Sequence, residues 1–195
     1  MWWQVSADGT RLLFYFGFGA SEKHHPNSVK AVHADYIEAT GVATLRRDGF
    51  VGVAPRPHAE NGRLITRPLL LSSARLFVNV VLPSAASTLR VEVLSGAGRR
   101  ANASAAASAW AKECGLGGKR APKLSGPIDS VKAEVGFPSQ GGLGALIGRR
   151  VRLRFTLSGA GSELFAFWFT DAPDGRSGGY LGGGQIGRKG APIDN

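Results

Sequence analysis

The sequence predicts an all-β protein whose main domain is an antiparallel β-sandwich of the jelly-roll type. Three observations support this prediction: short runs of alternating apolar and polar residues, turn-forming dipeptides between them, and a hydrophobic fraction of 43%, which is enough for a packed core. The alternation is clearest in residues 88–94 and 150–157, where every second side chain is Leu, Val or Phe. Such a period of two places the apolar side chains on one face of a strand.

Most of the expected strands lie in the second part of the chain. They cover residues 63–71, 75–82, 88–94, 130–135, 150–157 and 163–170, with a tight turn or a single helical turn at 143–148. The Ala- and Ser-rich run 101–111 is predicted as a short helix or a disordered insert, because alanine favours helix but no capped amphipathic pattern is present. We expect a β-sandwich domain over residues 63–171 and a Gly-rich disordered tail over 172–195.

The first 55 residues are expected to form a smaller unit. Its predicted strands are residues 12–16, 41–47 and, after the turn pair Asp48-Gly49, 50–53. Residues 17–39 between them are predicted as a long irregular loop. Two or three strands are too few for an independently stable domain, so residues 1–55 are interpreted as part of a larger sheet structure, such as one blade of a β-propeller. A linker with Pro and Gly is predicted at 56–62.

Several classes of protein are excluded by composition. No apolar run approaches the roughly 18 residues that a membrane-spanning helix needs. Cys114 is the single cysteine, so the sequence predicts no intrachain disulfide and no zinc or iron–sulfur site built from cysteines. The first residues lack the basic start, the apolar stretch and the cleavage site of a secretory signal. These features do not fix a cellular compartment.

The positive charge of the chain is concentrated after residue 60. Residues 1–60 hold six basic and six acidic side chains, whereas residues 61–195 hold 18 basic and eight acidic ones. This excess would suit a polyanionic partner, but the basic residues alternate with others along the predicted strands, so nucleic acid is disfavoured as a partner. Only Arg149, Arg150, Arg152 and Arg154 are clustered.

Two sequence blocks near the N-terminus resemble a known family. Residues 11–17 (RLLFYFG) and 41–51 (GVATLRRDGFV) are similar to the last blade of five-bladed propeller proteins related to the invertase and arabinanase families of glycoside hydrolases. Residues 64–69, 76–80, 89–94, 146–155 and 164–169 resemble the β-sandwich that follows such propellers. The resemblance implies that the catalytic carboxylates lie on earlier blades, which a chain starting just before the last blade does not contain. The loop 20–40 is longer than the resemblance implies.

The carboxylates of this chain give no clear catalytic pair. Glycoside hydrolysis requires two carboxyl groups at a fixed distance. Asp35 and Glu38 would share a face only if their loop were helical, and solvated loop charges are the favoured interpretation. Asp48 is interpreted as a turn former, and Glu92 and Glu134 as surface partners of basic residues on neighbouring strands. The sequence therefore predicts no catalytic residue in this chain.

No cofactor or metal is predicted. His24, His25 and His33 with Asp35 have metal-ligand types, but their spacing matches no established motif, and surface histidines are favoured. Cys114 has no flanking pattern of a nucleophile, and nothing shows that His58 approaches it.

Aromatic side chains are candidate sugar-binding platforms, because a flat ring can pack against the apolar face of a sugar. Trp110, in the polar insert, is the candidate ligand-binding residue, although a packing anchor for the loop is also consistent with its position. Alternation predicts Phe165, Phe167 and Phe169 on one strand face and Trp168, with Leu164 and Ala166, on the other. Trp2 and Trp3 would be exposed if no further blades cover them.

Three functions follow from these observations. The leading hypothesis is a non-catalytic β-sandwich module of a glycoside hydrolase-like protein that supports carbohydrate recognition or packs against a propeller. The alternative is a glycosidase acting on plant or microbial glycans whose catalytic blades are missing from this chain. The second alternative is a basic module that binds polyanions through Arg149, Arg150, Arg152 and Arg154. The expected partners are a carbohydrate or a propeller domain, and the oligomeric state is not predicted.

Overall fold

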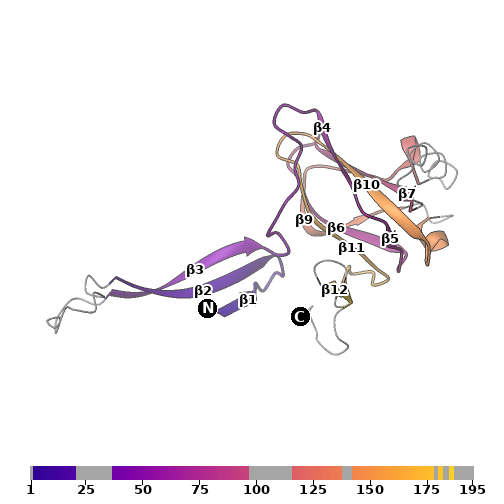
Figure 1. Cartoon of the computed structure of the whole chain (residues 1–195). Coiled ribbons are helices and arrows are strands. Elements are labelled where there is room, and N and C mark those ends of the chain that lie inside the picture. Colours follow the sequence, from indigo (N-terminus) through magenta and orange to yellow (C-terminus); the bar gives the residue numbers. More distant parts are fainter. Residues whose placement is uncertain are drawn as a thin grey trace. The chain divides into compact units, whose positions relative to one another are not determined.

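The computed structural model describes residues 2–20, 37–96, 116–137, 142–177, 180–181 and 185–186. These residues form β-strands and two short 3-10 helices, and no α-helix occurs among them, so the prediction of an all-β protein with antiparallel sheets is confirmed. The chain divides into two compact units, residues 1–50 and residues 51–195 (Figure 1).

The first unit is one antiparallel sheet in the order β1-β2-β3. Its strands are β1 (Trp2–Val5), β2 (Arg11–Ala20) and β3 (Ile37–Arg46). Strand β1 was not expected from the sequence. The turn between β1 and β2 is closed by Asp8, whose carboxylate accepts hydrogen bonds from the Ser6 hydroxyl and from the backbone and hydroxyl of Thr10. These bonds lower the pKa of Asp8 to about 2.

Two predictions about the first unit were wrong. The predicted loop 17–39 is partly strand, because the ladder between β2 and β3 continues from the Gly17–Thr40 pair to the Ala20–Ile37 pair. Backbone hydrogen bonds sustain this ladder even where glycines supply no side chain to pack. Asp48-Gly49 forms the predicted turn, with Asp48 at φ 52°, but residues 50–53 do not return along β3.

The segment after this turn joins the second unit instead. Val53 and Leu164 exchange two backbone hydrogen bonds of 2.8 and 3.0 Å. The unit boundary therefore falls between Phe50 and Val51, whereas the sequence placed the end of the first segment at residue 55. The first strand of the second unit begins at Asn61, within the segment 56–62 that was predicted as a linker.

The second unit contains two larger antiparallel sheets. A five-stranded sheet has the order β4-β10-β7-β8, with β5 also paired to β10, and a three-stranded sheet has the order β11-β6-β9. The strands of the first sheet are β4 (Asn61–Ile65), β5 (Leu69–Leu70), β7 (Thr88–Ser95), β8 (Lys123–Ser125) and β10 (Arg150–Ser158). Those of the second are β6 (Arg75–Leu82), β9 (Ile128–Val135) and β11 (Glu163–Thr170).

Short elements complete this unit. They are the 3-10 helices η1 (Gly118–Arg120) and η2 (Leu143–Leu146) and the strand pair β12 (Tyr180–Leu181) and β13 (Gln185–Ile186). The run 101–111 lies outside the described residues, so its predicted helix or disorder is not assigned.

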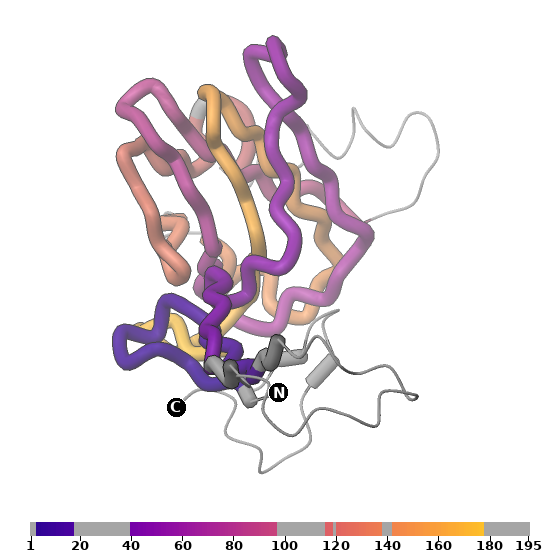
Figure 2. The backbone as a smooth tube through the Cα atoms, turned by 90° about the vertical axis from the view of Figure 1, so that its left-hand side faces the viewer, coloured from indigo at the N-terminus to yellow at the C-terminus, as the bar shows by residue number. Residues whose placement is uncertain are grey.

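The two larger sheets share one hydrophobic core, which gives the second unit a β-sandwich-like character. The alternating residues of β10 and of its neighbour β7 contribute to the same core as those of β6 in the other sheet, and Figure 2 traces the backbone of these segments. The buried side chains of these three strands are Leu76, Val78, Val80, Leu82, Leu89, Val91, Val93, Val151, Leu153, Phe155 and Leu157. The predicted alternation of residues 88–94 and 150–157 is therefore confirmed.

The single strand predicted at 63–71 is two strands. Both β4 and β5 pair with β10, but residues 66–68 interrupt the ladder. Pro68 lacks the N–H that a continuous strand would need. Thr66 compensates locally, since its hydroxyl accepts a hydrogen bond from the Leu153 N–H at 3.0 Å and its own N–H donates to the Leu153 carbonyl at 3.0 Å.

The predicted faces of the aromatic strand β11 were partly wrong. The register between β6 and β11 shifts between Leu164 and Ala166, which marks a β-bulge. The extra residue returns Leu164 to the core side, where it lies with Phe167 and Phe169. Trp168 points to the opposite face and stacks on Phe77, with ring centroids 6.1 Å apart.

The beginning of the Gly-rich tail is ordered, contrary to the prediction for 172–195. The Trp168 indole N–H donates to the Gly175 carbonyl at 2.9 Å. Gly175 has φ +76°, and a Cβ there would approach the Phe77 ring to 2.8 Å, so this close turn requires glycine. Residues 172–177 therefore cover the stacked pair of rings.

The core makes a direct prediction for Phe155, which is fully buried and whose ring centroid lies 5.0 Å from that of Phe167. Phe155→Ala leaves a cavity and should lower the free energy of unfolding by about 3–5 kcal/mol. The control Ile147→Ala, at a side chain that is 50% exposed, should lower it by less than about 1 kcal/mol. Urea unfolding followed by tryptophan fluorescence measures both, and equal losses would contradict the core as described.

Candidate functional site

The carboxylates considered for catalysis do not form a pair among the described residues. Asp35 and the side chain of Glu38 lie outside the described part of the chain, although the backbone of Glu38 belongs to β3. Asp48 is exposed in its turn, with a carboxylate oxygen 3.9 Å from the Arg47 Nε. The geometry of Asp48 agrees with its interpretation as a turn former.

Glu92 on β7 is the most enclosed of these carboxylates, with a side chain only 8% exposed. One oxygen accepts a hydrogen bond from the Arg154 Nε at 2.6 Å, and the other accepts one from the Gly118 N–H at 3.0 Å. Burial by itself raises the pKa of Glu92. The two hydrogen bonds and the nearby Arg154 and Arg90 charges lower the pKa by more than burial raises it, so the pKa lies below its usual value. Glu92 is therefore ionised and structural.

Segment 116–120 completes the surroundings of this ion pair. Arg90 donates from Nη1 to the Gly118 carbonyl at 2.9 Å, while the N–H of the same residue binds Glu92. The hydrogen bond to Glu92 is the main cause that raises the pKa of Arg154. The group holds β7, β10 and the η1 segment together on one face of the five-stranded sheet.

Glu134 on β9 forms a second, more exposed ion pair. Its carboxylate lies 3.1 Å from Arg75 Nη1, and both side chains are 41% exposed. This agrees with its predicted role as a cross-strand partner of a basic residue.

The aromatic candidates give no free platform within the described part of the molecule. Trp110, the residue predicted to bind a ligand, lies outside the described residues. The Trp168 ring stacks on Phe77, and its N–H donates to the Gly175 carbonyl. Trp3 is 66% exposed on β1 of the first unit.

The histidines and the cysteine form no site that the structure describes. His24, His25, His33 and Cys114 all lie outside the described residues. His58 is exposed in a turn at φ 65°. Within the described ranges, no group of three or more His, Cys, Asp or Glu side chains could hold a metal ion.

A shallow hollow of about 270 Å³ lies beside the start of β4. It is bordered by the segment from Val53 to Leu64 and by Leu157. Arg56 and Arg63 are its charged lining residues, and no acidic side chain lines it. Because it offers no carboxylate, this hollow is not suited to acid–base hydrolysis.

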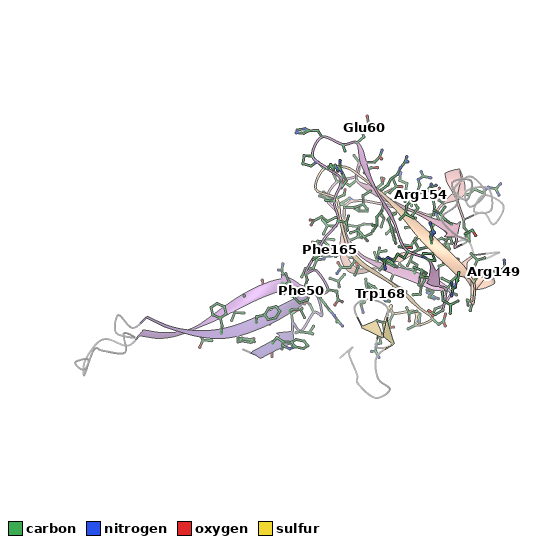
Figure 3. The ribbon with its side chains drawn as sticks, in the orientation of Figure 1. Phe50, Glu60, Arg149, Arg154, Phe165 and Trp168 are labelled. Atoms are coloured by element: carbon green, nitrogen blue, oxygen red, sulfur yellow. The ribbon has the colours of Figure 1, made fainter. Side chains whose placement is uncertain are left out.

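The strongest chemical feature of the second unit is the outward face of the five-stranded sheet, here called the arginine face. It is defined by Arg63, Arg90, Lys123, Arg150, Arg152 and Arg154. These side chains alternate with the buried residues of the same strands, so they share one side of the sheet. Figure 3 shows Arg154 on β10 and Arg149 just before this strand begins.

Sequence reasoning found only part of this face. The cluster Arg150, Arg152 and Arg154 was visible as a run, but Arg149 precedes the strand and is not one of the alternating positions. Arg63, Arg90 and Lys123 were missed, because they come from other strands. Their position next to inward-facing aliphatic side chains was the available signal, and only the strand register brings them together.

No protein-family model matches the chain, and no curated protein or solved structure is similar enough to match it. Among the described residues, no helix has the length and apolar character required to cross a lipid bilayer.

The two ion pairs predict different responses to removal of a carboxylate. Glu92→Gln leaves Arg154 without its enclosed anionic partner and should lower the free energy of unfolding by about 2–3 kcal/mol. The control Glu134→Gln, at the exposed pair, should cost less than about 1 kcal/mol. Denaturant unfolding at neutral pH measures both changes, and equal effects would contradict the enclosed role of Glu92.

The same comparison has a pH dependence. The folded-state pKa of Glu92 lies below its ordinary value of 4.5, so its stabilising contribution is complete above that pH and is lost as pH falls through the lowered value. The difference in unfolding free energy between the wild type and Glu92→Gln should therefore shrink on acidification below pH 4.5. A difference that grows on acidification would contradict this sign.

Proposed function

We propose that the chain is the non-catalytic C-terminal part of a glycoside hydrolase-like protein. In this proposal the first unit belongs to the terminal blade of a five-bladed propeller, and the second unit is a jelly-roll-like β-sandwich that supports propeller packing or carbohydrate recognition. The proposal extends the resemblance carried by residues 11–17 and 41–51, which fall on β2, on β3 and on the turn after β3.

The observation that carries the proposal is the absence of buried side chains among the described residues of the first unit. None of the side chains described in residues 3–17 and 40–50 is buried. Large apolar side chains are exposed on the sheet and on the turn after it: Trp3, Phe16, Val42 and Phe50. Since a small sheet needs a packed face to be stable in water, the apolar side chains of this sheet require another protein surface to pack against. A propeller supplies it, because each blade packs between its neighbours.

The partners of four described carboxylates favour a module without catalysis. Glu92 and Glu134 are held in ion pairs, and Asp8 and Asp171 accept backbone hydrogen bonds from Thr10 and Ala74. A glycosidase needs two carboxyl groups that are available to the substrate. In the proposed arrangement these groups are supplied by other blades.

We predict that the purified chain does not hydrolyse aryl glycosides of fructose, arabinose, xylose or sialic acid. The physical reason is that a correctly spaced carboxyl pair is expected on other blades. Release of the aryl chromophore measures the activity. Hydrolysis that is abolished by Asp35→Ala or Glu38→Ala would overturn the proposal and favour the glycosidase alternative.

We also predict that the first unit is the less protected part of the isolated chain. Amide hydrogens of β2 and β3 should exchange faster than those of β6, β7 and β10, because none of the described side chains of the first sheet is buried. Hydrogen exchange with mass spectrometry measures this, and sedimentation checks the oligomeric state. Equal protection of β2 and β10 in a monomer would contradict the need for an external blade.

A further inference from the structure

The charges of the second unit are divided unevenly between its two larger sheets. The strands of the five-stranded sheet carry six basic side chains and one acidic side chain, Glu92, a net charge of +5. The strands of the three-stranded sheet carry two basic and three acidic side chains, a net charge of −1. The excess is therefore a property of one sheet and not of the unit as a whole.

The strand register gathers this charge on one side. Thr156 of β10 is paired with Arg63 on β4 and with Arg90 on β7, and Arg90 is in turn paired with Lys123 on β8. Directly paired residues point to the same side of a sheet. Along β10 the arginines follow each other at every second residue, about 6.6 Å apart. The result is a two-dimensional array of cations.

Most of this charge is not neutralised within the described part of the chain. Arg154 has its carboxylate partner in Glu92, whereas no ion pair to Arg63, Arg150 or Arg152 occurs among the described residues. The Arg152 Nε is buried and has no hydrogen-bond partner there. Unsatisfied buried donors are rare in native proteins and are commonly explained by a bound ion or water. Because Arg63, Arg150 and Arg152 have no carboxylate partner among the described residues, the arginine face has capacity for anions.

Aliphatic side chains lie among the cations. Ile65 is paired with Arg154 and Leu70 with Arg150, and both aliphatic side chains are more than half exposed. Aliphatic groups beside guanidinium groups suit a ligand with apolar C–H surface and regularly spaced anionic groups. Single-stranded nucleic acid is bound instead by aromatic side chains that stack on bases, and the described strands of this sheet place no aromatic residue on the arginine face.

We propose that the arginine face binds an acidic polysaccharide, a glycan with carboxylate or sulfate groups along its length. Guanidinium groups donate paired hydrogen bonds to such oxyanions, and Ile65 and Leu70 contact the C–H faces of the sugar rings. Glu92 lies on the same face as Arg154, but both of its carboxylate oxygens are occupied by protein donors, and it keeps Arg154 and the neighbouring strands in place. This inference goes beyond the proposed function, because the charge of the face does not depend on the first unit belonging to a propeller.

The test measures binding of fluorescently labelled polymers to the full chain at 50 and 200 mM salt. The probes are polygalacturonate for carboxylate, dextran sulfate for sulfate, dextran as a neutral glycan, and single- and double-stranded DNA. The expected result is binding to at least one acidic glycan, weaker at the higher salt because counterions are released on binding. Dextran should not bind, and binding to polygalacturonate or to dextran sulfate identifies the anionic group.

Paired variants locate the site. R150Q/R152Q removes two charges from the arginine face and should weaken binding about tenfold or more, as expected for loss of charge-assisted hydrogen bonds. K132Q/R176Q removes two charges elsewhere and should leave affinity within about twofold of the wild type. R63Q/R150Q, at two exposed positions, repeats the test if loss of Arg152 impairs folding.

Four results would overturn the proposal. They are an absence of binding to either acidic glycan at 50 mM salt, equal binding of dextran, equal weakening by the K132Q/R176Q control, and tighter binding of DNA than of both glycans. The last result would assign the face to nucleic acid. None of these results depends on glycosidase activity or on exchange in the first unit, so this inference and the proposed function fail separately.

Discussion

The register of β10 is the constraint on which the second unit depends. Its backbone pairs with β4 and β5 on one side and with β7 on the other, while Val151, Leu153 and Phe155 fill the core shared with β6. Because strand side chains alternate, filling the core in this way directs the arginines of β10 outward. A slip of one residue would bury these guanidinium groups and expose the core residues, at a large energetic cost. The same register therefore fixes the core and the arginine face.

Glu92 shows how a crowded cationic face is accommodated. It lies opposite Arg154 in the register and is the sole acidic residue in the strands of the five-stranded sheet. Its second oxygen is bound by the Gly118 N–H, so the carboxylate is enclosed by protein donors and does not compete for an external anion. Replacing both partners of such a pair can leave stability nearly unchanged, whereas removing one partner leaves an unpaired buried charge. We infer that the pair specifies the register between β7 and β10 more than it adds net stability.

The strand limits could be predicted from the sequence where apolar and polar side chains alternate regularly. The predicted limits of β6 and β11 agree with the structure, and those of β10 differ by one residue. Prediction failed where backbone geometry and hydrogen bonding determine the limits and faces of the strands. Pro68 divides one predicted strand, the bulge after Leu164 reverses a face, and the ladder between β2 and β3 continues through Gly17 and Gly19. The arginine face was only partly predictable for a related reason, since Arg63 and Lys123 reach it through strand pairing between segments distant in sequence.

Binding and bond cleavage place different demands on a β-sheet. Cleavage of a glycosidic bond needs carboxyl groups with matched pKa values and free access, and the ion-paired carboxylates described here are committed to their partners. Binding of a polyanion needs only fixed positive charge with accessible donors. Cations carried on hydrogen-bonded strands have their backbone already ordered, so less conformational entropy is lost when a ligand binds than on a loop. The second unit meets this requirement of the proposed glycan binding through the paired strands β4, β7, β8 and β10.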